Sequence, residues 1–364
     1  KNLHRDIKKN HRIFIDDGLV QLKVEKIKES EIFCIAKTSG ILKSNKGINT
    51  PDSSISAKSL SEKDIKDLEF GIKMKVEFVA LSFIKSENDI KNLRKIISRK
   101  KHQPKIIAKI ERHEAVENIK TLENIIIASD AVMVARGDLG VEIKPEQVPI
   151  IQKTIIKLSN KHAKPVITAT QVLASMVYSP RPTRAEISDA ANAIFDNTDA
   201  IMLSNETAIG KYPTQSVMTL ARVISEVENE QKKHNEIINS EIQNKYFPEL
   251  NSTCLSACEL ALDYKAKKII AYSKDGYTVR NLAKHRIFIP IIAVTPNKNL
   301  IPELSLTWGI NKSLYKKFDQ KVIEKSFLKN IIPFLLSNRI VNKNERIVVV
   351  YNAKNKGSIA SIKI

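Results

Sequence analysis

Hydrophobic and polar residues follow a short, strand-like pattern in the first part of this 364-residue chain. From Arg12 to about Lys58, brief apolar runs are separated by turn residues, and Asp16–Gly18 lies between the first two runs. Asp-Gly between apolar runs is typical of a β-hairpin, because glycine accepts the positive φ angle that a tight turn needs. We therefore predict a small β-rich domain over residues 1–58.

A different pattern begins near Ser61, where five short apolar runs alternate with amphipathic stretches up to about residue 228. The runs are Val76–Ile84, Lys105–Glu111, Ala131–Gly140, Pro165–Leu173 and Ala200–Gly210. Ser61–Asp64 can cap a helix, and Thr183 and Glu186 have the spacing of a capping box. Strict β-α alternation with buried strands predicts a parallel sheet over residues 59–228, either doubly wound or a barrel.

A polar, charged stretch up to Lys245 separates this segment from a third one, which again alternates helix and strand. The predicted elements are the helices Thr253–Ala266, Tyr277–Lys284 and Glu324–Leu336 and the strands Lys268–Tyr272, Ile289–Val294 and Arg346–Tyr351. We interpret residues 229–364 as a separate α/β domain.

The three cysteines and the overall composition indicate a reduced, cytoplasmic protein. Apolar residues make up 42% of the chain, yet no apolar run reaches the roughly 18–20 residues that cross a bilayer. The residues from Lys1 to Arg12 are charged and contain no apolar h-region, so we expect no signal peptide in them. Cys254 and Cys258 are four residues apart in a helical pattern, so we expect them to share a packed face. Metal binding by this pair is disfavoured, because no nearby His or Cys completes a ligand set.

The net charge of +20 raises the hypothesis of nucleic-acid binding. The lysines, however, are scattered, and no aromatic residues are interleaved with a dense basic block. The chain is rich in Lys, Asn and Ile, which A/T-biased codon usage is sufficient to produce. We therefore predict no nucleic-acid partner and no membrane partner, although the charge could draw anionic substrates towards the protein.

Polar residues end each of the five apolar runs, and in a βα barrel the carboxyl ends of the strands converge on the active site. The candidates include Ser82 near the end of the first run, Lys109 and Glu111 at the end of the second, Asp138 in the third and Thr170 in the fourth. Burying a lysine and two carboxylates at one rim is costly, so their presence indicates a use.

Lys109 and Glu111 are two residues apart, so both point to the same side of an extended strand. Glu111 and Asp138, expected on neighbouring strands, could hold a divalent cation such as Mg²⁺. A lysine beside that ion could neutralise charge on a phosphoryl group in transfer. The alternative is a Lys–Glu pair that only stabilises the barrel. The spacing favours a function and leaves the reaction class open.

Several long motifs then carry a family resemblance, in matching order and spacing over essentially the whole chain. Ala108–Arg112, Met133–Gly140, Ile167–Gln171 and Pro182–Glu186 resemble the pyruvate kinase family. Asp16–Gly18 resembles the lid domain of that family, Ser44–Gly47 its nucleotide-facing loop and Gly357–Ile364 its carboxyl end. The resemblance implies a partial (β/α)8 TIM barrel with five βα units, a β-rich lid and a C-terminal α/β domain.

The resemblance implies a glycolytic kinase that transfers phosphate from phosphoenolpyruvate to ADP, giving pyruvate and ATP. Mg²⁺ (or Mn²⁺) and usually K⁺ would be required, and a cytoplasmic homotetramer is typical, with Arg181–Glu186 towards a subunit interface. Lys109 would stabilise the transferring phosphoryl group and the enolate oxygen. Glu111 and Asp138 would bind the metal.

The remaining roles that the resemblance implies concern substrate and nucleotide. Ser82 would contact the substrate, and the backbone amides of Gly137 and Asp138 would receive its carboxylate. Thr170 would lie near the methylene carbon that is protonated as pyruvate forms. Lys46 would approach the nucleotide phosphates when the lid closes, a movement that excludes water.

The chain departs from the family in having five barrel strands where closure needs eight. By the resemblance, the missing strands and the start of the lid precede Lys1 and carry the K⁺ ligands, a substrate-binding arginine and most nucleotide contacts. We therefore expect an N-terminally truncated chain that is inactive or aggregation-prone alone. The alternatives are a decayed or split subunit that acts only as an interaction partner, and another βα-barrel enzyme that acts on phosphoenolpyruvate or pyruvate through Mg²⁺.

A second departure concerns a candidate effector loop in the C-terminal domain. By resemblance, the phosphate of an effector would be cradled by Ser273, Lys274, Asp275, Gly276, Tyr277 and Thr278. Tyr277 stands where arginine is common in the family, and Asp275 would repel phosphate. The sequence thus argues against allosteric control by a sugar phosphate or a nucleotide.

Overall fold

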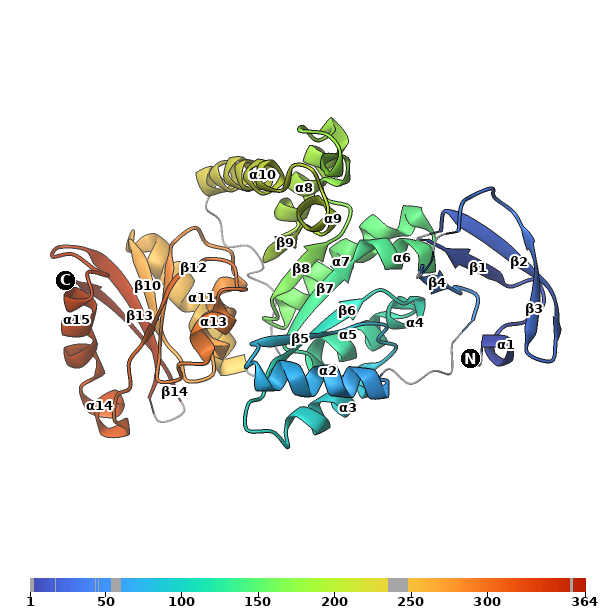
Figure 1. Ribbon diagram of the computed structural model, residues 1–364. Helices are drawn as coiled ribbons and strands as arrows, with labels where there is room; N and C mark the ends of the chain where they lie inside the picture. Colours follow the sequence, from blue (N-terminus) through green and yellow to red (C-terminus); the bar gives the residue numbers. More distant parts are fainter. Residues whose placement is uncertain are drawn as a thin grey trace. The chain divides into compact units, whose positions relative to one another are not determined.

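The computed structural model describes residues 3–16, 18–42, 44, 46–53, 60–234, 248–353 and 356–364 (Figure 1). The chain forms two compact units. The first contains Lys1–Leu158, Val166–Asp189 and Ile201–Met218, and the second contains Ser159–Pro165, Ala190–Ala200 and Thr219–Ile364. No helix among the described residues is long and apolar enough to span a membrane.

The N-terminal part of the first unit is a four-stranded sheet in the order β3-β2-β1-β4, which we call the lid. The strands are β1 (Arg12–Ile15), β2 (Val20–Lys28), β3 (Glu31–Ala36) and β4 (Ile48–Asn49), preceded by the short helix α1 (Leu3–Asp6). β1 pairs antiparallel with β2 and with β4, which confirms the predicted hairpin strands. Asp17 of the predicted turn lies outside the described residues.

The second sheet of the first unit contains five parallel strands in chain order, with β5 and β9 at its edges. The strands are β5 (Phe78–Leu81), β6 (Lys105–Ile110), β7 (Ala131–Ala135), β8 (Val166–Ala169) and β9 (Ala200–Met202). All residues of β7 and β8 are buried, as expected for strands covered on both faces. The five predicted βα units are therefore confirmed.

The helices around this sheet begin where the sequence signals indicated. They are α2 (Glu62–Lys73), α3 (Glu87–Ile97), α4 (His113–Val116), α5 (Ile119–Ala128), α6 (Arg136–Glu142), α7 (Val148–Lys161), α8 (Arg184–Phe195), α9 (Asn205–Ala208) and α10 (Pro213–His234), with 3₁₀ turns at Pro145–Gln147 and Ala174–Val177. Ser61 and Asp64 form a capping box at α2. Thr183 and Glu186 bond each other's backbone amides before α8, at 3.2 and 2.8 Å. Both predicted caps are confirmed.

The second unit contains a five-stranded sheet in the order β12-β11-β10-β13-β14, parallel except for its last pair. The strands are β10 (Lys268–Tyr272), β11 (Ile291–Thr295), β12 (Ile310–Tyr315), β13 (Arg346–Ala353) and β14 (Lys356–Lys363), and the helices are α11 (Pro248–Asp263), α12 (Tyr277–Ala283), α13 (Leu300–Leu304), α14 (Gln320–Lys325) and α15 (Phe327–Ser337). Cys254 and Cys258 are fully buried on one face of α11, as predicted.

Candidate active site

Lys109 and Glu111 lie side by side at the carboxyl end of β6. Lys109 Nζ is 3.0 Å from Glu111 Oε2, and the same ammonium group donates to Ser82 Oγ at 2.9 Å. Ser82 follows the neighbouring strand β5. The prediction that these two charged residues share one side of the strand is confirmed, and Ser82 joins them.

The Glu111 carboxylate is fully buried, and its two oxygens have different surroundings. Oε1 accepts the backbone N–H of Phe83 at 2.7 Å. Oε2 faces the lysine as an ion pair and has no hydrogen-bond partner among the described residues. Burial raises the pKa of Glu111, and the attraction of Lys109 opposes that rise. A buried carboxylate oxygen with a free lone pair suits a divalent cation as ligand.

Asp138 is not on a strand, contrary to the expectation that it would share a neighbouring strand end with Glu111. β7 ends at Ala135, and Asp138 belongs to the first turn of α6. A carboxylate is favoured there, because the amino end of a helix carries partial positive charge. Burial is the largest cause of the raised pKa of Glu111, and the negative charge of Asp138 is a smaller cause that acts in the same direction. The two carboxylates are therefore within electrostatic reach of each other.

Thr170 connects the end of β8 to the start of α6. Its hydroxyl accepts the backbone N–H of Gly137 at 2.8 Å and donates to the carbonyl of Ala169 at 2.7 Å. Thr170 and Gln171 have φ angles of +66° and +52°, in a region that a β-branched residue such as threonine rarely adopts. The Gly137 amide, which we expected to receive a substrate carboxylate, thus bonds Thr170 in this structure.

Arg136, which is not among the site residues predicted from the sequence, holds this strained turn. Its guanidinium is only 8% exposed and donates to the carbonyls of Thr170 and Gln171 at 2.9 to 3.1 Å. It also pairs with Asp189 at 2.7 Å. A charged residue directly after the apolar run of β7 was the signal that could have identified it, since arginine is seldom buried without a partner.

Lys46 lies on the lid, two residues before β4. Its ammonium group pairs with Asp16 Oδ1 at 2.8 Å, across the turn that follows β1. Asn45, beside it in the predicted nucleotide-facing loop, lies outside the described residues. The role of Lys46 towards a nucleotide stays a prediction.

The candidate effector loop, Ser273–Thr278, joins β10 to α12 in the second unit. The Asp275 carboxylate accepts the N–H of Tyr277 at 3.0 Å, and the Ser273 hydroxyl accepts the N–H of Gly276 at 3.0 Å. Gly276 has φ +79°, and a Cβ there would lie 2.7 Å from a guanidinium nitrogen of Arg280. The positive φ angle of this position favours glycine, and the loop bonds two of its own amides internally. Its effector response stays a prediction.

These features define a protein of βα-barrel units with a charged site of one lysine and two carboxylates where strands meet helices. Family models agree with this class: the barrel domain of pyruvate kinase matches residues 1–217, and the α/β domain of pyruvate kinase matches residues 251–364. The chain belongs to the pyruvate kinase family. The resemblance inferred from the sequence motifs is confirmed.

Individual relatives give the same result. A pyruvate kinase of Clostridium acetobutylicum is 44% identical over 327 residues, and one of Staphylococcus aureus is 41% identical over 318 residues. Each alignment covers 87% of this chain, but 67% and 54% of those two proteins. A crystal structure of a pyruvate kinase from Cryptosporidium parvum superimposes with a TM-score of 0.85 at 30% identity, covering 100% of this chain and 74% of that one. The chain spans little more than half the length of the Staphylococcus relative.

Proposed function

We propose that the protein transfers a phosphoryl group between phosphoenolpyruvate and ADP, giving pyruvate and ATP. The observation that carries the proposal is the Lys109–Glu111 pair at the end of β6, with Ser82 on one side and Asp138 within electrostatic reach. Family membership supports the reaction class. Positive charge beside a metal-type carboxylate is what phosphoryl transfer needs, because the protein contributes mainly positioning and electrostatics.

Glu111 and Asp138 would hold a Mg²⁺ or Mn²⁺ ion, and their chemistry fits one. Both offer carboxylate oxygens, and Glu111 Oε2 is buried without a hydrogen bond. When bound, the ion would neutralise negative charge on the enolate and phosphoryl oxygens. A need for K⁺ is carried over from the family, and we assign no ligand to it.

Lys109 would place its ammonium group against the transferring phosphoryl group. The Ser82 hydroxyl and the Glu111 carboxylate lie 2.9 and 3.0 Å from the ammonium nitrogen of Lys109 and fix its position. Little reorganisation would therefore accompany the reaction. Thr170 would lie near the carbon that gains a proton, in a turn fixed by Arg136. Gly137 and Asp138 would bind the substrate carboxylate after the Thr170 hydroxyl releases the Gly137 amide.

Lys46 would approach the nucleotide phosphates from the lid. We further propose a cytoplasmic homotetramer, with the Arg181–Glu186 segment towards a neighbouring subunit. These two roles rest on the family alone.

The direct test is phosphoenolpyruvate-dependent ATP formation, compared between Lys109→Met and Lys105→Met. Lys105 begins the same strand and has the same side chain, so it controls for loss of a lysine on β6. We expect Lys109→Met to lower kcat by roughly 10² to 10³, the usual cost of one preorganised electrostatic contact, and Lys105→Met to change it little. Equal, measurable activity of the two variants would refute the assigned role.

A further inference from the structure

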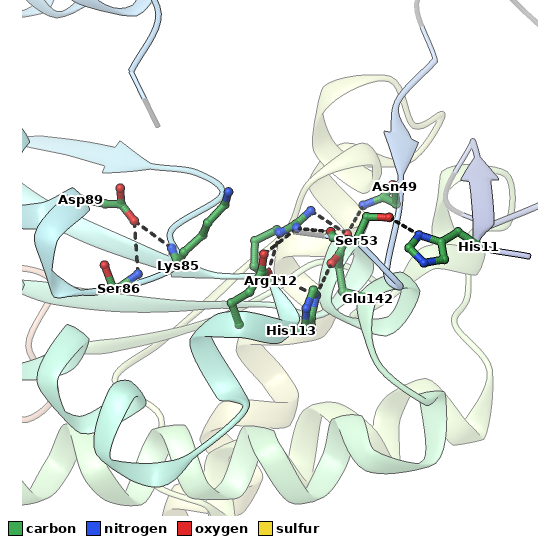
Figure 2. Close-up of polar contacts among 10 residues, drawn as sticks. His11, Asn49, Ser53, Lys85, Ser86, Asp89, Arg112, His113 and Glu142 are labelled. Carbon is green, nitrogen blue, oxygen red and sulfur yellow. Dashed lines mark hydrogen bonds and ion pairs between the residues drawn. The ribbon is translucent and has the colours of Figure 1, made fainter. Parts of the chain in front are cut away.

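A buried polar cluster joins the lid to the barrel sheet through the segment Asn49–Ser53, which we call the strap. Figure 2 shows Arg112, His113 and Glu142 of the barrel side facing Asn49 and Ser53 of the strap. Asn49 and Ser53 are 6% and 5% exposed. The strap begins with the last residue of β4, three residues after Lys46 in sequence, so its position affects the lid residue to which we assign a nucleotide role.

Arg112 is the residue immediately after Glu111 and is 4% exposed. Its guanidinium contacts Glu142 Oε1 at 3.2 Å and the Glu114 carboxylate at 2.9 and 3.0 Å. It also donates to the backbone carbonyl of Ser53 at 3.4 Å. One arginine thus connects the end of β6, two carboxylates and the strap.

Glu142 ends the helix α6, whose first turn carries Asp138. Its side chain is completely buried. Oε1 accepts the Asn49 side-chain amide at 3.2 Å, and Oε2 lies 3.2 Å from His113 Nδ1 (Figure 2). The carboxylate therefore bonds both the strap and the barrel loop after β6, at the far end of the helix that carries Asp138.

The strap is also bonded to the lid itself. Asp52 accepts the backbone N–H and both guanidinium arms of Arg12 at 2.6 to 3.0 Å, and the Ser53 hydroxyl is 2.7 Å from His11 Nδ1. A lid displaced from the barrel would have to break bonds on one side of the strap.

Apolar packing between lid and barrel is limited next to this cluster. A cavity of about 610 Å³ lies beside it and is lined by Phe14 and Gln21 of the lid and by Val141 and Ile143 at the end of α6. The polar contacts at the strap therefore hold the lid against the barrel where apolar side-chain packing is limited. Hydrogen bonds to charged groups at buried positions are strong enough for that purpose, and they are directional.

We propose that Glu142 and Arg112 are positioning residues, which set the placement of the lid over the site by fixing the strap. The proposal rests on the proposed function for its catalytic consequence, because it links Lys46 to Glu111 and Asp138 through one network. The effect is exerted through Asn49 and Ser53. Neither Glu142 nor Arg112 has to touch a substrate.

The same carboxylates do not make a convincing metal site. Ligand atoms of His113, Glu114 and Glu142 lie within 4.8 Å of one another, a spacing that would allow all three to bind one metal ion. The Arg112 guanidinium, however, already contacts both carboxylates, and a divalent ion would be repelled by that charge. The cluster is better explained as a structural junction.

The experiment measures the lid–barrel distance in solution by double electron–electron resonance. One spin label goes on the native Cys34 in β3 and the other on Asn92→Cys, at an exposed position of α3. The test variants are Asn49→Leu, which removes the bridging amide without changing charge, and Glu142→Gln. Glu114→Gln is the matched control, because Glu114 contacts Arg112 and His113 but has no described bond to the strap. Arg112 is left intact, since its removal would strand two buried carboxylates.

We expect both test variants to broaden or shift the distance distribution, and Glu114→Gln to leave it unchanged. In the assay, the KM for ADP should rise roughly tenfold, the value of one charge-assisted hydrogen bond, while the KM for phosphoenolpyruvate stays constant. Unchanged distance distributions in Asn49→Leu and Glu142→Gln would overturn the proposal, whatever the activity. Distributions that change in both test variants would support the junction even where the chain shows no turnover, so the junction and the proposed function are tested separately.

Discussion

Lys109 Nζ lies 3.0 Å from Glu111 Oε2, and that carboxylate oxygen is buried without a hydrogen bond. The pairing gives the lysine a fixed direction and leaves the carboxylate able to take a cation. Burial raises the pKa of Glu111, so this group holds its proton more tightly in the folded protein than in the unfolded chain. Its contribution to stability is thus present at low pH and is lost as the pH rises through the raised pKa.

Metal binding should depend on pH in the opposite sense. Only the ionised carboxylate is a ligand, so Mn²⁺ affinity should weaken as the pH falls through the raised pKa of Glu111, and binding at that pH should release a proton. Calorimetry in two buffers of different ionisation enthalpy measures the proton directly. A constant affinity from neutral pH down into the acid range would contradict the assignment of Glu111 as a ligand.

Replacing Arg136 should lower the free energy of unfolding of the first unit. Arg136→Met would leave the carbonyls of Thr170 and Gln171 without their donor, and we expect a loss of about 2–3 kcal/mol in the free energy of unfolding. Urea denaturation followed by circular dichroism measures this. Arg99→Met, at an exposed position in the turn after α3, is the control and should fall within about 0.5 kcal/mol of the parent. Equal midpoints for the two variants would argue that Arg136 does not support the turn.

His285 should make the second unit sensitive to acid. It is fully buried, and neither ring nitrogen has a hydrogen-bond partner among the described residues. Burial lowers the pKa of His285 to about 3. Below the ordinary histidine pKa the unfolded chain takes up a proton that the folded chain does not, so stability is lost as the pH falls.

We expect His285→Phe to remove about 2 kcal/mol of the stability loss between pH 7 and pH 5. Trp308, the single tryptophan of the chain, is in the same unit, and its fluorescence follows the unfolding of that unit. If the parent protein and the variant lose stability in parallel over this range, His285 is not the responsible group.

The three cysteines should differ sharply in reactivity. Burial raises the pKa of Cys254 to about 12 and also raises that of Cys258, while Cys34 is partly exposed on the lid. A thiol reagent should therefore modify one cysteine in the folded protein and three in urea. Cys34→Ser should abolish the reaction of the folded protein. Rapid modification of a second thiol would show that α11 is not packed as described.

The alternation of apolar runs with amphipathic stretches was sufficient to predict the five parallel strands, because buried strands need continuous apolar sequence. The spacing of Lys109 and Glu111 was likewise sufficient, because side chains two apart on a strand share a face. Strands β12 and β14 were missed. They carry polar and charged residues, such as Lys312 in β12 and Lys363 in β14, and so lack a clear strand signature.

Residues that act across long separations could not be predicted from local pattern. Asn49 and Glu142 are 93 positions apart, and only the folded chain brings them together. Asp138 was placed on a strand because an apolar run preceded it, whereas the helix α6 begins without a loop after β7. Arg136 was overlooked for a related reason, since its partners Thr170 and Gln171 come from the next βα unit.

Mn²⁺ binding by electron paramagnetic resonance tests the central claim most directly, because it reads the site without requiring turnover. We expect Glu111→Gln and Asp138→Asn to lose the bound ion, while Glu114→Gln, in the nearby carboxylate cluster around Arg112, retains it. Retention of the ion in Glu111→Gln, or its loss in Glu114→Gln, would contradict the claim that Glu111 and Asp138 form the metal side of the active site.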